Sequence, residues 1–144
     1  MPLKKISIGL LYLGFSLAIA QGENKTPPAF NFGTKDIKES ISAHIRAVEV
    51  DGVFSIEDGD KKLALKFADF RGPAREMEGK GHFICVDFNL VGGEKDQQYD
   101  LDFWVKPDSA DTAKLKVTEV KIHRHPVKEK GKWVKKARYS YVEE

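Results

Sequence analysis

The chain lacks the cysteine pairs and the sequence motifs that indicate disulfide bonding or catalysis in small proteins. Cys85 is the only cysteine among 144 residues, so an intramolecular disulfide is impossible. There is no P-loop, no Rossmann glycine pattern, no G-x-S-x-G and no H-E-x-x-H motif. No catalytic motif is therefore complete, and we predict no catalytic residue. An exposed thiol would oxidise outside the cell, so we expect Cys85 to be buried and to act as a small apolar side chain.

Long apolar runs are also missing, except at the N-terminus. Lys4 and Lys5 precede an uncharged stretch from Ile6 to Ile19, and Ala18-Ile19-Ala20 fits the small-x-small cleavage pattern. The stretch is shorter than the roughly 20 residues that span a bilayer. We therefore predict a signal peptide over residues 1–20, cleavage rather than retention as a membrane anchor, and export to a bacterial periplasm or the extracellular space.

An excess of one charge is absent as well. The full chain has 24 basic and 22 acidic residues, and removing the two lysines of the signal peptide would leave 22 of each. A chain with no net charge lacks the electrostatic footprint of a nucleic-acid binder, so no nucleic-acid partner is expected. Residues 21–33 contain Pro27-Pro28 and predict a tether. Residues 34–144 are then long enough for a single domain with its own core.

Hydrophobic periodicity predicts one helix followed by five or six strands. Apolar residues at helical spacing indicate an amphipathic helix from about Thr34 to Val48, with Val48 as the last residue of its buried stripe. Two-residue alternation then predicts a first hairpin around Asp58-Gly59, a loop over residues 71–81 and three meandering strands over residues 82–91, 98–106 and 115–125. A basic loop over residues 126–132 and a last strand over residues 133–142 complete the chain.

The apolar pattern of the strand over residues 115–125 shifts by one position along the strand. Leu115 and Val117 are apolar at odd positions, whereas Val120 and Ile122 are apolar at even ones. Because side chains alternate strictly along a strand, both pairs reach one face only if an extra residue is inserted. We predict a β-bulge near Thr118-Glu119, and hence a bent sheet. The result is an α+β fold in which the helix packs on a bent antiparallel sheet. In element order it resembles the cystatin-like and NTF2-like rolls, which implies a helix in the concave face but no particular activity.

Polar and aromatic residues share one side of two predicted neighbouring strands. Asp100, Asp102 and Trp104 alternate with core residues, and Asp87 joins them if the connecting hairpin closes. This face could bind a ligand or a partner protein through Trp104. Simple cross-strand ion pairing is the alternative for the aspartates, and its expected partners are Lys114, Lys116 and Lys121.

Histidines provide a second candidate site. His123 and His125 are two residues apart on a strand, so their imidazoles point to the same side and could bind Zn²⁺ or Cu²⁺ with His82 or Asp102. Two exposed histidines at the end of a strand are the alternative.

The leading hypothesis is a small exported, non-catalytic binding or accessory protein of the bacterial envelope. Its partner would be a small molecule or an envelope protein, bound on the face that carries Asp87, Asp100, Asp102 and Trp104. A metal-binding protein that uses the histidines is the first alternative. A small hydrolase- or isomerase-like roll with a buried Asp/His pair is the second.

Overall fold

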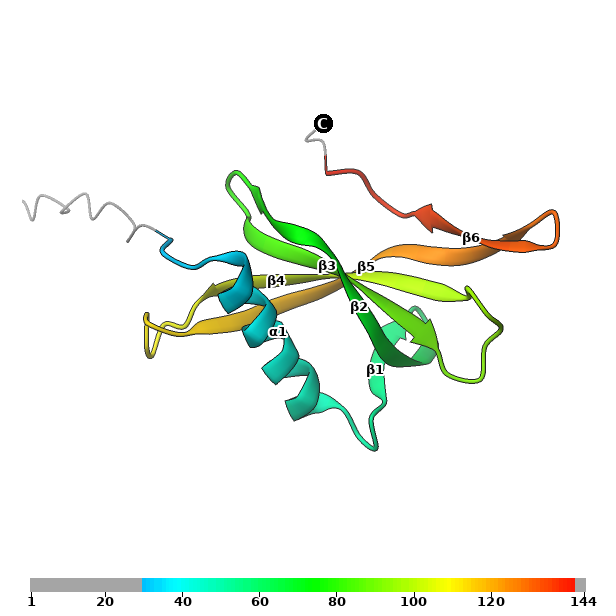
Figure 1. The fold of residues 1–144 in the computed structure, drawn as a ribbon, viewed down its shortest axis with the longest axis horizontal. Helices are drawn as coiled ribbons and strands as arrows, with labels where there is room; N and C mark the ends of the chain where they lie inside the picture. Colours follow the sequence, from blue (N-terminus) through cyan, green and yellow to red (C-terminus); the bar gives the residue numbers. More distant parts are fainter. Residues whose placement is uncertain (1–29, 142–144) are drawn as a thin grey trace, which may run out of the picture.

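A computed structural model of the protein describes residues 30–141. Over this range the chain forms one helix and a six-stranded antiparallel sheet, whose strands lie side by side in sequence order (Figure 1). The predicted α+β fold is therefore confirmed. The predicted signal peptide and most of the predicted tether lie outside the described residues. The elements are α1 (Thr34–Val48), β1 (Phe54–Asp58), β2 (Lys61–Met77), β3 (Gly81–Leu90), β4 (Gln98–Pro107), β5 (Leu115–Glu129) and β6 (Lys132–Ala137).

The helix α1 lies across one face of the sheet, here called the helix face (Figure 1). Its first turn is capped by Asp36, whose carboxylate accepts a hydrogen bond of 2.8 Å from the backbone N–H of Gly33. Ile37, Ile41 and Ile45 repeat at helical spacing and are buried against the sheet. Val48 is 49% exposed, so the buried stripe ends one turn earlier than its spacing predicts.

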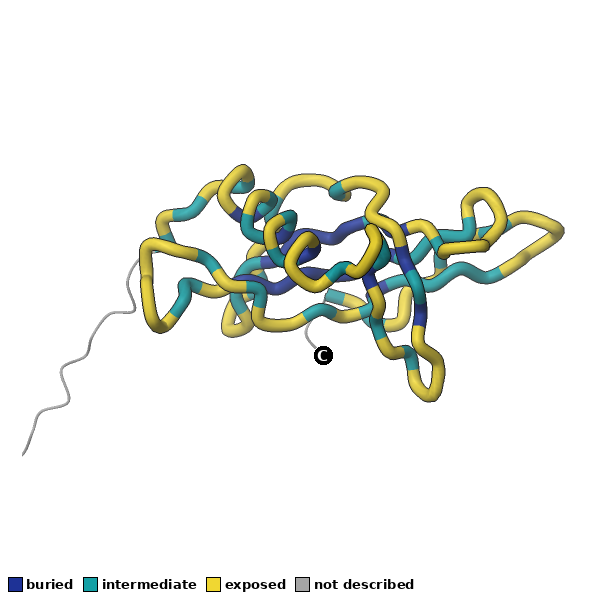
Figure 2. Tube along the Cα trace, turned by 90° about the horizontal axis from the view of Figure 1, so that it is seen from below, coloured by how far each residue is buried: buried dark blue, intermediate teal, exposed yellow. Residues whose placement is uncertain are grey.

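The core lies between α1 and the central strands, where Figure 2 shows the buried residues gathered in the middle of the molecule. Residues at alternating positions of β3 and β4 face the helix, and neighbours across the two strands pair directly, as Ile84 does with Phe103 and Val86 with Leu101. Burying apolar surface of this extent is the main force that holds the layers together. The buried core residues of the sheet on this face are Phe54, Leu63, Leu65, Ile84, Val86, Phe88, Leu101, Phe103 and Val105.

The strand β5 carries two bulges. Trp104 is opposite Glu119 and Val105 is opposite Val117, which leaves Thr118 as the extra residue. The predicted bulge is thus confirmed, and it restores Val117 and Val120 to the same face. A second bulge was not predicted: Asp100 is opposite Arg124 whereas Leu101 is opposite Ile122, so His123 is the extra residue there. This insertion places His123 on the face opposite the helix.

Two segments predicted as loops are strands. Within residues 71–81, β2 continues to Met77 because Gly72, at a φ of 75°, allows a bulge that also accommodates the proline that follows it. Within residues 126–132, β5 continues to Glu129. Pro126 pairs there with Lys135 of β6, at a point where β5 no longer has β4 as a neighbour. The N–H that proline lacks therefore costs no hydrogen bond to β4.

The last strand is shorter than predicted. It ends at Ala137, and residues 138–141 leave the sheet edge and turn toward the face opposite the helix. Within the described part of the chain, no helix combines the length and the apolar character needed to cross a membrane.

Candidate functional site

The face of the sheet opposite α1, here called the opposite face, carries the polar residues that the sequence singles out. The register of β3 and β4 places Cys85 opposite Asp102 and Asp87 opposite Asp100. Both Asp100 and Asp102 are fully buried, at 0% exposure, although each lies on the side of the sheet that has no helix. Two buried carboxylates in one strand require compensating donors or charges, because an unpaired buried charge is costly.

The donors for Asp102 come from the end of the chain. Residues 138–141, here called the C-terminal segment, place the hydroxyl of Tyr139 at 2.6 Å from Oδ2 of Asp102 and that of Tyr141 at 2.8 Å from both carboxylate oxygens. The segment is anchored by Arg138, whose guanidinium donates two hydrogen bonds of 2.6 and 2.8 Å to the carboxylate of Asp58. The backbone N–H of Arg138 also donates to the carbonyl of His123. The C-terminal segment therefore acts as the cover that buries Asp102.

His123 lies under the same cover and is 5% exposed. Its Nε2 is 3.1 Å from the carbonyl oxygen of Tyr139, which can only accept, so Nε2 carries a hydrogen. Its Nδ1 is 2.7 Å from the hydroxyl oxygen of Tyr141 and 3.9 Å from Oδ1 of Asp102.

A single hydroxyl links the imidazole and the carboxylate of this cluster. The hydroxyl oxygen of Tyr141 lies 2.7 Å from Nδ1 of His123 and 2.8 Å from each carboxylate oxygen of Asp102. Because Tyr141 carries one hydroxyl hydrogen, it donates to one of these neighbours at a time.

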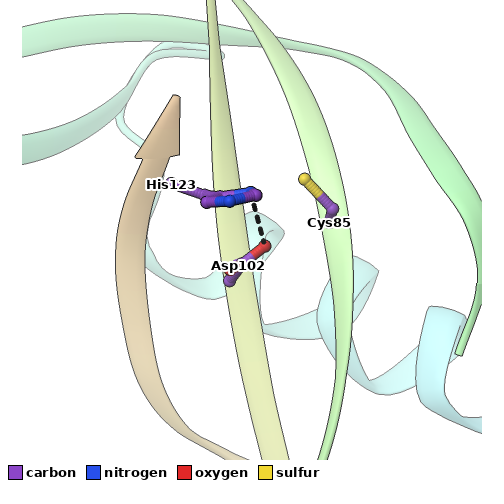
Figure 3. Close-up of side chains that lie close together, drawn as sticks. All are labelled: Cys85, Asp102 and His123. Carbon is purple, nitrogen blue, oxygen red and sulfur yellow. Dashed lines mark ion pairs between the residues drawn. The ribbon is translucent and has the colours of Figure 1, made fainter. Parts of the chain in front are cut away.

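Cys85 completes the cluster. Figure 3 shows its sulfur, the ring of His123 and the carboxylate of Asp102 converging from β3, β5 and β4. Cys85 is buried, as predicted. Burial, together with the negative charges of Asp102 and Asp100, raises the pKa of the thiol well above its usual range. A protonated thiol is a poor nucleophile, so Cys85 and His123 do not form a thiolate pair of the catalytic kind.

The second buried carboxylate is held by cations. Lys135 of β6 donates to Asp100 at 2.6 Å and to Asp87 at 3.2 Å, while the guanidinium groups of Arg71 and Arg124 each lie 3.8 Å from Oδ2 of Asp100. Burial, with a further contribution from the neighbouring Asp87, raises the pKa of Asp100. Burial also acts to raise the pKa of Asp87, but its hydrogen bonds with Asp100 and Lys135 lower that pKa on balance. Asp87, Asp100 and Lys135 therefore form one hydrogen-bonded group of charges on the opposite face. The guanidinium groups of Arg71 and Arg124 lie beside it.

The predicted cationic partners of the aspartates are therefore wrong. Lys116 is opposite Lys106, beyond the end of the carboxylate row, and Lys121 pairs instead with Glu119 at 3.6 Å. Asp102 has tyrosines as partners and Asp100 has Lys135 and the two arginines, because the end of the chain folds over this face.

His82 and His125 lie apart from His123. His82 stacks on Phe30 with ring centroids 3.6 Å apart. His125 Nδ1 accepts a hydrogen bond of 3.0 Å from Arg138, and burial, with the nearby charge of Arg138, lowers the pKa of His125. Neither joins His123 in a group whose ligand atoms could contact one ion, so the predicted all-histidine arrangement is not assembled among residues 30–141.

Trp104 is buried, at 8% exposure, and stacks on Phe83 with a centroid separation of 4.4 Å. Its indole N–H has no acceptor among residues 30–141. The indole forms part of the wall of a groove of about 530 Å³ between the β2–β3 turn, β4, β5 and the C-terminal segment. The groove is lined by Met77, Gly79, Lys80, Trp104, Lys106, Thr118, Glu119, Lys121, Tyr139 and Ser140.

The chain matches no model of a protein family, no curated protein and no solved structure. The site must therefore be interpreted from its own geometry.

Proposed function

We propose that the protein is a small non-catalytic binding protein that holds a small organic anion in the groove beside Trp104. The proposal rests on the wall of the groove, where the indole of Trp104 lies with its N–H buried and without an acceptor among residues 30–141. Leaving a buried N–H unpaired costs roughly 1–3 kcal/mol. A small turn of the indole toward the groove on binding would let an oxygen atom of the ligand accept this hydrogen and remove the cost. The volume of the groove, about 530 Å³, falls within the usual range for small-molecule sites.

The charges around the groove favour an anion. Lys80, Lys106 and Lys121 line it against the single carboxylate of Glu119. Lys121 is paired with Glu119, whereas Lys80 and Lys106 have no ion-pair partner in the described part of the chain. The ligand class that fits is a phosphate or carboxylate attached to an apolar group, with the anion near the lysines and the apolar part against the aromatic wall.

Phenyl phosphate is a suitable probe, and uncharged benzyl alcohol is its control. In a proton–nitrogen NMR spectrum the two indole N–H signals of the protein are distinguished by Trp133→Phe, which removes one of them. Phenyl phosphate is expected to move the Trp104 signal downfield in a saturable manner, because a phosphate oxygen accepts its hydrogen. Benzyl alcohol should leave it nearly unchanged.

Lys106→Gln is expected to weaken phenyl phosphate binding about tenfold or less, as a partly exposed charge contributes about 1 kcal/mol. Lys95→Gln is the matched control, because Lys95 lies in the β3–β4 loop at the far end of the hairpin from the groove. Equal affinity of Lys106→Gln and Lys95→Gln for phenyl phosphate would exclude the groove as an anion site. A Trp104 signal that does not move when phenyl phosphate is added would exclude it as well. Turnover of any substrate by the purified protein would exclude the non-catalytic assignment.

The proposal includes export to the bacterial envelope with cleavage after Ala20, for which residues 1–20 of the sequence are the support. Protein recovered from the exported fraction is expected to have the mass of a chain that starts at Gln21. The mass of the uncleaved chain in that fraction would contradict this part of the proposal without affecting the groove.

A further inference from the structure

Three side chains with metal-ligand chemistry meet beneath the C-terminal segment. One ligand atom each of Cys85, Asp102 and His123 lies within 4.8 Å of the other two, and all three residues are buried (Figure 3). A thiolate, an imidazole and a carboxylate together are a ligand set typical of Zn²⁺. We propose that these three residues bind a Zn²⁺ ion under the cover of Tyr139 and Tyr141.

Hydrogen bonds from the C-terminal segment already orient two of the three ligands. Metal-bound histidines commonly donate their other ring N–H to a backbone carbonyl or carboxylate, which fixes the ring. Nε2 of His123 has this role toward the carbonyl of Tyr139, and Nδ1 is the nitrogen that faces Asp102. The hydroxyl of Tyr139 likewise orients the carboxylate of Asp102 with a bond of 2.6 Å. The side chains of His123 and Asp102 are thus held in place by the cover.

The ligand set can also balance the charge of the ion. A bound Zn²⁺ would displace the thiol proton of Cys85 to solvent, and the thiolate and the carboxylate of Asp102 would then balance its two positive charges. The hydroxyls of Tyr139 and Tyr141 both donate to that carboxylate and keep it in position.

None of the three metal ligands lines the Trp104 groove, although Tyr139 borders both the groove and the cluster. The site also differs from one made of His123 and His125, because it takes its sulfur ligand from β3 and uses one histidine. The competing interpretation is that hydrogen bonds alone hold the cluster together. The two interpretations differ in whether the reduced protein binds a metal ion through sulfur.

The experiment is a titration of the reduced protein with Co²⁺ as a spectroscopic substitute, followed by displacement with Zn²⁺. The expected result is one ion per chain, with a sulfur-to-cobalt charge-transfer band that Zn²⁺ abolishes. Cys85→Ser is expected to remove the band. Tyr139→Phe is expected to weaken Zn²⁺ binding about 10- to 100-fold, because the hydrogen bond from the Tyr139 hydroxyl to the carboxylate of Asp102 is lost.

His125→Gln and His82→Gln are the matched controls and should retain the band and the affinity. Cys85→Ala provides a second test, because alanine fits a buried apolar position, and this variant should fold and yet show no band. Absence of the band in the wild-type protein, or equal Zn²⁺ affinity in wild type and Cys85→Ala, would overturn the site and leave a cluster held by hydrogen bonds alone.

Discussion

Asp102→Ala is expected to lower the free energy of unfolding by about 3–5 kcal/mol, the range observed when one partner of a buried charged network is removed. The substitution leaves the hydroxyls of Tyr139 and Tyr141 without their acceptor and removes the carboxylate that lies 3.9 Å from Nδ1 of His123. Urea-induced unfolding, in the presence of a chelator so that no metal contributes, measures the loss.

Asp60→Ala is the matched control for Asp102→Ala. Asp60 is exposed at the β1–β2 turn and has no side-chain hydrogen bond or ion pair within residues 30–141, so the change should stay within about 0.5 kcal/mol. A loss below about 1 kcal/mol for Asp102→Ala would mean that Asp102 does not hold the C-terminal segment, since a single neutral hydrogen bond contributes that much.

The double variant Tyr139→Phe/Tyr141→Phe is expected to raise the labelling rate of Cys85 by about 100-fold or more. Cys85 is only 7% exposed, so a thiol reagent reacts after the C-terminal segment has lifted. The two phenol groups donate to a buried carboxylate, and hydrogen bonds to charged groups contribute about 1.5–3 kcal/mol each. Removing both hydroxyls makes opening easier while the aromatic packing against Phe83 and His123 is retained.

Labelling with a pyridyl disulfide, which stays reactive in acid, measures this opening directly. Tyr99→Phe serves as the control, because Tyr99 also lies on β4 but packs against the helix-face core, away from Asp102. Unchanged labelling in the double variant would show that Cys85 becomes accessible only by global unfolding.

The opening should also depend on pH through Asp58. The hydrogen bonds from Arg138 lower the pKa of Asp58 below its ordinary value of 3.8. A folded-state pKa below the unfolded one means that the contact contributes fully above pH 3.8 and is lost as the pH falls through the lower folded value. Asp58→Asn should therefore label faster than wild type at neutral pH, and the two rates should converge in acid below that value.

The sequence predicted those parts of the structure that depend on local periodicity. Ile37, Ile41 and Ile45 define the buried side of α1, since their spacing matches the helical repeat. The phase change between Val117 and Val120 predicted a bulge, because strict alternation allows no other way to bury both. Cys85 was predicted to be buried because an exposed thiol would oxidise outside the cell, and it is buried.

The residues of one turn and one proline explain why residues 126–132 were wrongly predicted as a loop. The turn between β5 and β6 is formed by Lys130 and Gly131, both at positive φ. Lysine is an unusual residue for that conformation, so the segment lacks the Asn-Gly or Asp-Gly signal of a tight hairpin. Pro126 reinforced the error because proline normally ends a strand, yet here the missing N–H lies where β5 has one neighbour.

What the sequence by itself determined is the fold class, the helix, the first hairpin, the three-strand meander and the side of β4 on which Asp100, Asp102 and Trp104 lie. The tertiary structure alone decided what surrounds them. The C-terminal segment covers the opposite face, and the bulge at His123 turns its imidazole toward Asp102. Cys85, Asp102 and Tyr139 are far apart in the chain, and their meeting depends on register and on the path of the last residues. Periodicity determines which side a residue faces, whereas only the folded chain determines which residues it meets there.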